Sequence, residues 1–185
     1  MAGKLFAQVE SLLQSGGSKL PPVQSWHPPF SGDIDIHIAR DGNWYHEGAP
    51  MTRAAIVRLF ASILRREGDE YFLVTPVEKW RIRVEDVPFI AVDVEAMGEG
   101  VDAELVFRTN VGDLVHANAL HPLRVQTDPV SGAPSPYVMV RHGLEARIAR
   151  SVFYRLVESA EAVGADEGAL YGVYSGGLFH PLGAG

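Results

Sequence analysis

The chain has 185 residues, of which 46% are hydrophobic and 21% are charged, and its formal net charge is −7. This composition is typical of a folded globular protein of one or two domains, and the acidic balance disfavours nucleic acid polymers and anionic membranes as partners, since both need a basic surface. The chain has no cysteine, which excludes disulfides, thiolate catalysis and cysteine-ligated metals, and no apolar run near the ~20 residues that span a bilayer, so we expect a cytoplasmic protein.

The beginning of the chain predicts a helix and an extended segment. Apolar residues at helical spacing over 4–14, followed by a Ser-Gly run, predict a short helix within an N-terminal segment of residues 1–19. Residues 20–30 are rich in proline, whose fixed φ and missing amide favour an extended strap outside any sheet interior. We expect Trp26 and Phe30 to be buried and to hold this strap on the body of the protein.

The next segment predicts a strand, a hairpin and a helix. Apolar and polar residues alternate over 33–39, as in a half-buried strand. The Asp-Gly pair within 40–43 suits a type I′ turn into a returning strand. Thr52 is the expected N-cap of a helix whose apolar periodicity continues to about Arg66.

Most of the remaining chain predicts β structure. Residues 151–162 have the apolar spacing of a helix, and residues 144–148 fit a strand or a helix equally. The element order indicates an α+β protein whose C-terminal half is a small antiparallel barrel-like sheet with a C-terminal helix. The expected strands cover residues 70–75, 79–84, 89–96, 102–109, 112–117, 121–126, 136–142, 170–174 and 178–182.

Two pairs of similar segments indicate an internal duplication. The pairs are residues 42–46 with 112–116, and residues 71–82 with 137–148, in the same order and at similar offsets. We therefore predict two related β-rich halves, residues 20–84 and 85–185, with a pocket at the seam between them. The alternative is that a common turn is reused, since a third Gly-x-apolar-x-His sequence occurs at 176–180.

Five stretches together resemble a known bacterial family. They are residues 32–36 (GDIDI), 75–80 (TPVEKW), 84–89 (VEDVPF), 107–113 (FRTNVGD) and 143–150 (GLEARIAR). Over roughly residues 20–182 the chain resembles the family catalogued as domain of unknown function 1285. This resemblance implies a duplicated α+β core, a C-terminal part similar to a pleckstrin-homology barrel, a ligand site at the seam with a nucleotide-like molecule as one candidate, and a role in signalling. It implies no catalytic residue.

Two basic strand segments are candidate sites for an anion. Lys79 and Arg81 share one face of their strand, and Trp80 lies on the other. Arg147 takes the place of Arg81 in the second half, so that two guanidiniums converging at the seam would clamp an anion. The alternative is a solvated strand with charge pairs and a core tryptophan. With Asn110 as a polar contact and Tyr137 as a stacking ring, the candidate ligand residues are Lys79, Trp80, Arg81, Asn110, Tyr137 and Arg147.

No spacing in the sequence points to a metal, a cofactor or a catalytic residue. The seven histidines include no pair at helical i, i+4 spacing, so we assign no metal ligand. His46, His116 and His180 follow glycine at the same position and are interpreted as structural side chains bonded to turn carbonyls. Asp33 and Asp35 share a strand face. If they are buried, the pair could carry out acid–base chemistry; the alternative is that both are solvated charges at a strand edge. The sequence has no nucleophile elbow, Walker A loop or dinucleotide fingerprint.

Three functions fit these observations. The first is a non-catalytic protein that binds a small anionic ligand, with a nucleotide-like molecule as one candidate, and reports its level to a partner. The second is a metal- or carboxylate-dependent hydrolase at the same seam. The third is a scaffold whose exposed strand edges dock another protein or a second copy of the chain.

Overall fold

A computed structural model describes residues 5, 7–9, 11, 20–164 and 168–184 of the chain. The chain divides into two compact units, Met1–Asp86 and Val87–Gly185, and each is described here by itself. This division is close to the boundary after residue 84 that the sequence predicts. The predicted helix over residues 4–14 lies mostly outside the described residues, but within it Leu5 and Val9 are buried.

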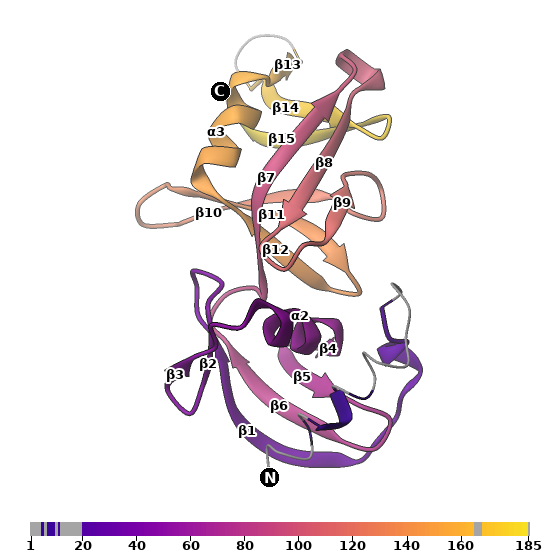
Figure 1. The fold of residues 1–185 in the computed structure, drawn as a ribbon. Coiled ribbons are helices and arrows are strands. Elements are labelled where there is room, and N and C mark those ends of the chain that lie inside the picture. The colour runs from indigo at the N-terminus through magenta and orange to yellow at the C-terminus, as the bar shows by residue number, and fades with distance from the viewer. Residues whose placement is uncertain (1–4, 6, 10, 12–19, 165–167, 185) are drawn as a thin grey trace. The chain divides into compact units, whose positions relative to one another are not determined.

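The first unit contains a six-stranded sheet with helix α2 on one side (Figure 1). The strand order is β3-β2-β1-β6-β5-β4, in which β1 and β6 are parallel and the other neighbours are antiparallel. The core includes Trp44, whose ring stacks on Phe60 of α2 at 6.4 Å between ring centroids. The elements are the 3-10 turn η1 (Val23–Ser25), β1 (Phe30–Ile38), β2 (Trp44–His46), β3 (Ala49–Pro50), α2 (Ala54–Ser62), β4 (Leu64–Glu67), β5 (Glu70–Val74) and β6 (Lys79–Val84).

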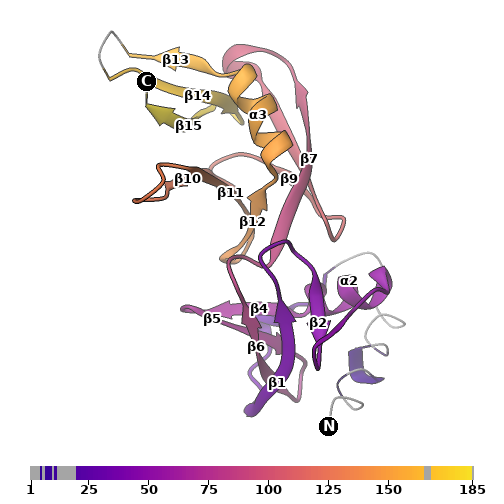
Figure 2. The same cartoon turned by 90° about the vertical axis from the view of Figure 1, so that its left-hand side faces the viewer.

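The second unit has a six-stranded sheet, a three-stranded sheet and one α-helix, α3. The orders are β10-β11-β12-β7-β8-β9, in which β12 and β7 are parallel, and β13-β14-β15. Helix α3 lies against β7 and β14 (Figure 2) and turns Val152 and Leu156 into the core. The elements are β7 (Phe89–Met97), η2 (Gly100–Asp102), β8 (Glu104–Thr109), β9 (Leu114–His116), β10 (Leu123–Thr127), β11 (Pro134–Arg141), β12 (Leu144–Ile148), α3 (Arg150–Glu158), β13 (Glu161–Val163), β14 (Leu170–Ser175) and β15 (Leu178–Ala184).

The two six-stranded sheets have the same strand order. When β1 to β6 are matched in sequence to β7 to β12, both sheets place the first and the last strand side by side and parallel at the centre. Each central strand continues outward into two antiparallel neighbours. The connections differ, because α2 joins β3 to β4 in the first unit, whereas residues 117–122 join β9 to β10 without a helix.

The repeated glycine segments do not occupy matching places in these sheets. The turn at Gly42 joins β1 to β2, whereas the turn at Gly112 joins β8 to β9. Both turns close with the same backbone bonds, because Gly42 N donates to Ala39 O at 2.9 Å and Gly112 N donates to Thr109 O at 3.0 Å. The other repeated pair, residues 71–82 and 137–148, does fall on matching strands, β5–β6 and β11–β12.

The structure corrects the predicted helix over Thr52 to Arg66. It ends at Ser62, and the residues from Leu64 onward form β4, which pairs with β5 through a turn at Gly68. Helical periodicity misled the prediction, because Leu64 is buried in the same core after the chain has left the helix. The N-cap position is Arg53, one residue after Thr52, and no side chain caps the helix.

The expected burial of Phe30 is also corrected. Phe30 is 54% exposed, and the strap is held instead by Arg65, whose Nη1 donates to Val23 O at 3.0 Å and to Trp26 O at 2.7 Å. A buried guanidinium can satisfy several carbonyls of a proline-rich segment that has no sheet partner. Residues 144–148, which fit a strand or a helix equally from the sequence, form the strand β12. Helix α3 is followed by β13, β14 and β15, of which the last two lie where the sequence predicts strands. No helix among the described residues has the length and apolar character needed to cross a bilayer.

Candidate ligand-binding groove

A groove opens in the first unit where the central pair of parallel strands loses its register. Asp33 of β1 lies opposite Arg81 of β6, and His37 lies opposite Arg83, so three residues of β1 lie opposite Ile82 alone. Such a bulge bends the strand and interrupts the ladder. The groove has a volume of about 500 Å³ and is lined by Asp33, Ile34, Asp35, Ile36, Arg81, Ile82 and Arg83.

Arg81, which the sequence marks as a candidate ligand residue, lines this groove but is held by two carboxylates. Its Nε and Nη2 donate to the two oxygens of Asp33 at 2.5 and 3.1 Å, and its Nη1 donates to Glu70 at 2.6 Å. These hydrogen bonds raise the pKa of Arg81 above its ordinary value, and the bond from Arg81 lowers the pKa of Asp33. Arg81 is therefore a fixed wall of the groove whose positive charge is already neutralised.

Arg83 and Asp35 supply the groove's other two charges. Both side chains belong to exposed residues, and no ion pair of either is found among the residues that the structure describes. A charged group that lacks a protein partner keeps its full capacity to bind a ligand group of opposite charge. The sequence analysis missed Arg83, although it follows Arg81 by two residues and so shares its strand face.

Lys79 and Trp80 lie on β6 outside the groove. Lys79 Nζ donates to Glu67 at 3.0 Å and lies 4.8 Å from the centre of the Phe72 ring. Burial opposes the ionisation of Glu67, but hydrogen bonds from Lys79 and Arg65 lower its pKa overall. Trp80 lies opposite Gly32, and its Nε1 is 3.4 Å from Glu78 Oε2. As the alternation predicts, the Trp80 side chain lies on the opposite face of β6 from Lys79 and Arg81. Trp80 does not line the groove.

Within the second unit, the structure brings its three predicted ligand residues into one line. Tyr137 lies opposite Arg147, and Arg147 lies opposite Ile90 in the parallel pair. Asn110 binds the same Ile90, because its N donates to Ile90 O at 2.8 Å and its Oδ1 accepts from Ile90 N at 3.0 Å. The Tyr137 ring is only 3% exposed and is covered by the Arg124 guanidinium at 4.0 Å, so a base cannot stack on it without moving Arg124.

A cross-strand row of the same composition occurs in each unit. In the first, which we call the Arg81 row, Arg65, Phe72, Arg81 and Asp33 lie side by side on β4, β5, β6 and β1. In the second, the Arg147 row, Arg124, Tyr137, Arg147 and Ile90 lie on the matching strands β10, β11, β12 and β7. Each row has the order arginine, aromatic, arginine, and only the fourth position changes from a carboxylate to an apolar side chain.

The outer arginine of each row was missed by sequence reasoning. Arg124 donates to both oxygens of the buried Glu145, at 2.7 and 2.8 Å. Arg65 is itself buried and donates to Glu67 as well as to the strap. Neither arginine belongs to a segment that the sequence analysis found repeated, because β4 and β10 share only the dipeptide Leu-Arg at their start.

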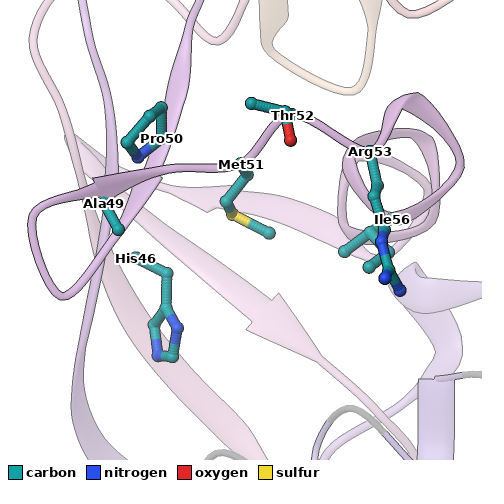
Figure 3. A pocket seen from close by; sticks show the side chains of 7 residues that line it. All are labelled: His46, Ala49, Pro50, Met51, Thr52, Arg53 and Ile56. Carbon is teal, nitrogen blue, oxygen red and sulfur yellow. The ribbon is translucent and has the colours of Figure 1, made fainter.

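A smaller hollow of about 270 Å³ lies beside the start of α2 (Figure 3). Its lining combines His46 and Arg53 with the apolar side chains of Met51 and Ile56. None of the candidate ligand residues lines this hollow, so the groove between β1 and β6 is the better candidate for a site.

The histidines serve structural roles where the structure gives them partners. His180 is buried, accepts from Leu123 N through Nδ1 at 3.4 Å and donates through Nε2 to Ser175 O at 3.2 Å. Burial lowers the pKa of His180. His37 Nε2 lies 2.7 Å from Glu85, which also accepts from Arg40 N at 2.8 Å. Among the described residues, no three histidine or acidic side chains form a group that could hold a metal ion.

Comparisons with known proteins place this architecture in a family. Residues 21–87 match the N-terminal domain of DUF1285, described as a domain of unknown function, and residues 88–182 match the C-terminal domain of DUF1285, described as a protein of unknown function. The chain therefore belongs to the DUF1285 family. No curated protein matches it.

Two crystal structures of DUF1285 family proteins are similar to this chain. One, from Silicibacter pomeroyi DSS-3, is 48% identical with a TM-score of 0.85, and the match covers 95% of this chain and 94% of that protein. The other, from Shewanella baltica OS155, is 32% identical with a TM-score of 0.54, and the match covers 67% of this chain and 91% of that protein. The resemblance stated from the sequence is thereby confirmed.

Proposed function

We propose that this protein is a non-catalytic binding protein for a small molecule with an anionic group, and that the groove between β1 and β6 holds the ligand. The observation that carries the proposal is that Arg83 lines the groove with no ion pair among the described residues, beside Arg81, which two carboxylates hold in place. Arg81 is positioned by its two carboxylates, and Arg83 is free to form a charge-assisted hydrogen bond. The groove's volume of about 500 Å³ is within the usual range for small-molecule sites.

A nucleotide-like ligand and the predicted seam stay predictions. A phosphate suits the two guanidiniums, but the residues that line the groove include no aromatic ring on which a base could stack. The signalling role also belongs to this proposal, since a ligand that binds one conformation better than another shifts their populations and so can report its level to a partner. The hydrolase alternative has the His37–Glu85 pair as its nearest support, and the scaffold alternative stays open.

We also propose that the two units arose by duplication, with the second unit extended by α3 and the small sheet into a barrel-like body similar to a pleckstrin-homology domain. The shared strand order and the matching Arg81 and Arg147 rows support the duplication. The repeat of residues 71–82 and 137–148 falls on matching strands and adds support. The repeat around Gly42 and Gly112 does not, because these turns join non-matching strands.

The test is a thermal-shift screen of the full chain against inorganic phosphate, adenosine monophosphate and simple carboxylates, followed by calorimetry. A ligand at 100 times its dissociation constant stabilises the folded protein by about 2.7 kcal/mol. We expect Arg83→Gln to weaken binding by about 1.5–3 kcal/mol, since it removes a charge-assisted hydrogen bond, and Arg81→Gln to weaken it less, since Asp33 and Glu70 already bind that guanidinium. Arg58→Gln, an exposed position on α2 outside the groove, is the matched control.

The variant Arg147→Ala separates this proposal from the clamp predicted from the sequence. Loss of binding in Arg147→Ala with no change in Arg81→Gln and Arg83→Gln would place the anion on the second unit and overturn the groove. If no molecule with an anionic group, zwitterions included, stabilises the protein at millimolar concentration, the binding function itself is overturned.

A further inference from the structure

The charges of the groove point to a more specific class of ligand, and this inference rests on the proposed binding function. We propose that the groove recognises a zwitterion that carries a carboxylate, an ammonium group and an aliphatic side chain, as an amino acid or a short peptide does. Arg83 takes the carboxylate and Asp35 takes the ammonium group.

The balance of charge is the first step of the argument. Of the four charged side chains that line the groove, Arg81 and Asp33 bind each other in a two-fold hydrogen bond. Arg83 and Asp35 are the remaining two, one of each sign, and both are exposed without an ion pair among the described residues. A purely anionic ligand satisfies Arg83 but is repelled by Asp35, whereas a zwitterion satisfies both.

The apolar lining is the second step. Ile36 and Ile82 are 1% and 6% exposed and form the buried part of the lining, while Ile34 is half-buried. Of these three isoleucines, Ile34 offers accessible apolar surface to an aliphatic group, whereas Ile36 and Ile82 have almost none. An accessible isoleucine beside the charged groups matches a molecule with a polar head and an aliphatic chain.

The broken ladder is the third step. Because three residues of β1 lie opposite Ile82 alone, peptide groups in this part of β1 have no register partner in β6. On its other side this segment is already bound, since Glu47 N donates to Asp35 O at 3.0 Å. Peptide groups without a strand partner can hydrogen-bond a ligand that has donors and acceptors of its own, as an amino acid or a peptide has. The groove's volume leaves room for more than one residue.

The experiment compares two zwitterions with two analogues that each lack one charged group. Calorimetry on the full chain uses L-leucine and leucyl-leucine as zwitterions, 4-methylpentanoate, which lacks the ammonium group, and isopentylamine, which lacks the carboxylate. We expect at least one zwitterion to bind at least tenfold more tightly than both single-charge analogues. Leucine and leucyl-leucine together decide whether the groove takes a free amino acid or a peptide.

Two variants assign the charges to residues. Asp35→Asn should weaken the zwitterion at least tenfold and leave 4-methylpentanoate unchanged or tighter, whereas Arg83→Gln should weaken both. Asp102→Asn, an exposed carboxylate in the second unit, and Arg58→Gln are the controls. Both groove residues are exposed, so their variants are expected to fold, and the probe series on the unaltered chain is informative even if one does not.

The outcomes separate this inference from the function on which it rests. If 4-methylpentanoate binds as tightly as leucine, depends on Arg83 and ignores Asp35→Asn, the protein binds anions in the groove and the zwitterion is overturned. If a zwitterion binds with no dependence on Arg83 or Asp35, the groove is not the site and both proposals fall. If none of the four probes binds while phosphate or a nucleotide does, only the zwitterion falls.

Discussion

The two six-stranded sheets share a strand order but differ where their first and last strands meet. In the first unit the pairing of β1 with β6 breaks between Asp33 and His37, and a groove opens there. In the second unit β7 pairs with β12 without a break over Phe89–Ala91, and its irregularity lies on the other side, against β8. One topology therefore supports a groove or a closed ladder, depending on which neighbour of the central strand the bulge faces.

The residue at the fourth position of each row also differs between the two units. Asp33 binds Arg81 across the parallel pair in the first unit, whereas Ile90 stands opposite Arg147 in the second. A carboxylate at this position fixes the guanidinium on the groove wall and keeps it from the ligand. Arginines at matching strand positions can therefore have different roles, because their cross-strand neighbour is a carboxylate in one unit and an apolar side chain in the other.

The largest change in stability is expected at Arg65, the arginine at the outer end of the Arg81 row. Arg65→Met removes a buried guanidinium from two strap carbonyls and from Glu67, so we expect a loss of about 3 kcal/mol in the free energy of unfolding. All three tryptophans lie in the first unit, so the fluorescence-detected unfolding of this unit reports the loss.

The matching change, Arg124→Met, should cost less, about 1–2 kcal/mol, because the Arg124 side chain is 46% exposed although Glu145 is buried. The double variant with Glu145→Met should recover most of this loss, since no carboxylate is then left buried and unpaired. Circular dichroism during urea unfolding measures both. Equal losses at Arg65 and Arg124 would mean that the strap contacts contribute little and that the rows are energetically equivalent.

The positions of the strands could be predicted from this sequence better than the ends of the helices or the ion-pair partners of charged side chains. The strand over Lys79–Val84 was predicted to the residue, because its alternating side chains and flanking turns are local signals. The helix continuing to Arg66 was wrong, since the apolar spacing of Ile63 and Leu64 is the same whether they complete a helix or begin a strand in one core.

The candidate site was predictable only in part. The sequence marks Arg81 as a cation on a strand face, but not that Asp33 and Glu70 neutralise it, because these partners come from strands distant in sequence or across a turn. The groove itself depends on a register break between β1 and β6, which no residue pattern within either strand reveals. Arg83 and Asp35 become notable only when that break places them on one groove.

The two units should also differ in how their stability depends on pH. Burial lowers the pKa of His180 in the folded second unit below the ordinary value of 6.5. The unfolded chain then binds a proton first as pH falls, so the second unit loses stability from about pH 6.5 downward until the folded pKa is reached. In the first unit the pKa values of Asp33, Glu67 and Glu85 are lowered from ordinary values of 3.8 to 4.5. These carboxylates therefore stabilise the folded unit at any pH above their ordinary pKa values, and this stabilisation is lost only as the pH falls below those values.

The variant His180→Gln checks this assignment. Loss of one or both hydrogen bonds of a buried side chain should lower stability at pH 7 by about 1–2 kcal/mol. Between pH 7 and pH 5 the variant should change less than the unaltered chain when both are followed by circular dichroism, while tryptophan fluorescence of the first unit stays unchanged in that range. The same pH dependence in both proteins would show that another group is responsible.

The smallest effects test why the glycine segments are repeated at non-matching places. Gly42 and Gly112 have φ values of +84° and +93°, and at Gly112 a Cβ would meet no atom within 4 Å, so the cost of a side chain there is conformational alone. We expect Gly112→Ala and Gly42→Ala each to lower the free energy of unfolding by about 1 kcal/mol, measured by urea unfolding. Asn tolerates positive φ better than Ala, so Gly112→Asn should recover part of the loss. Equal losses in the two units, with rescue by Asn, would mean that the turn conformation selects glycine independently at each place. A much larger loss at Gly112 than at Gly42 would contradict a purely local requirement, and the repeated segment would then need an explanation from the second unit's own packing.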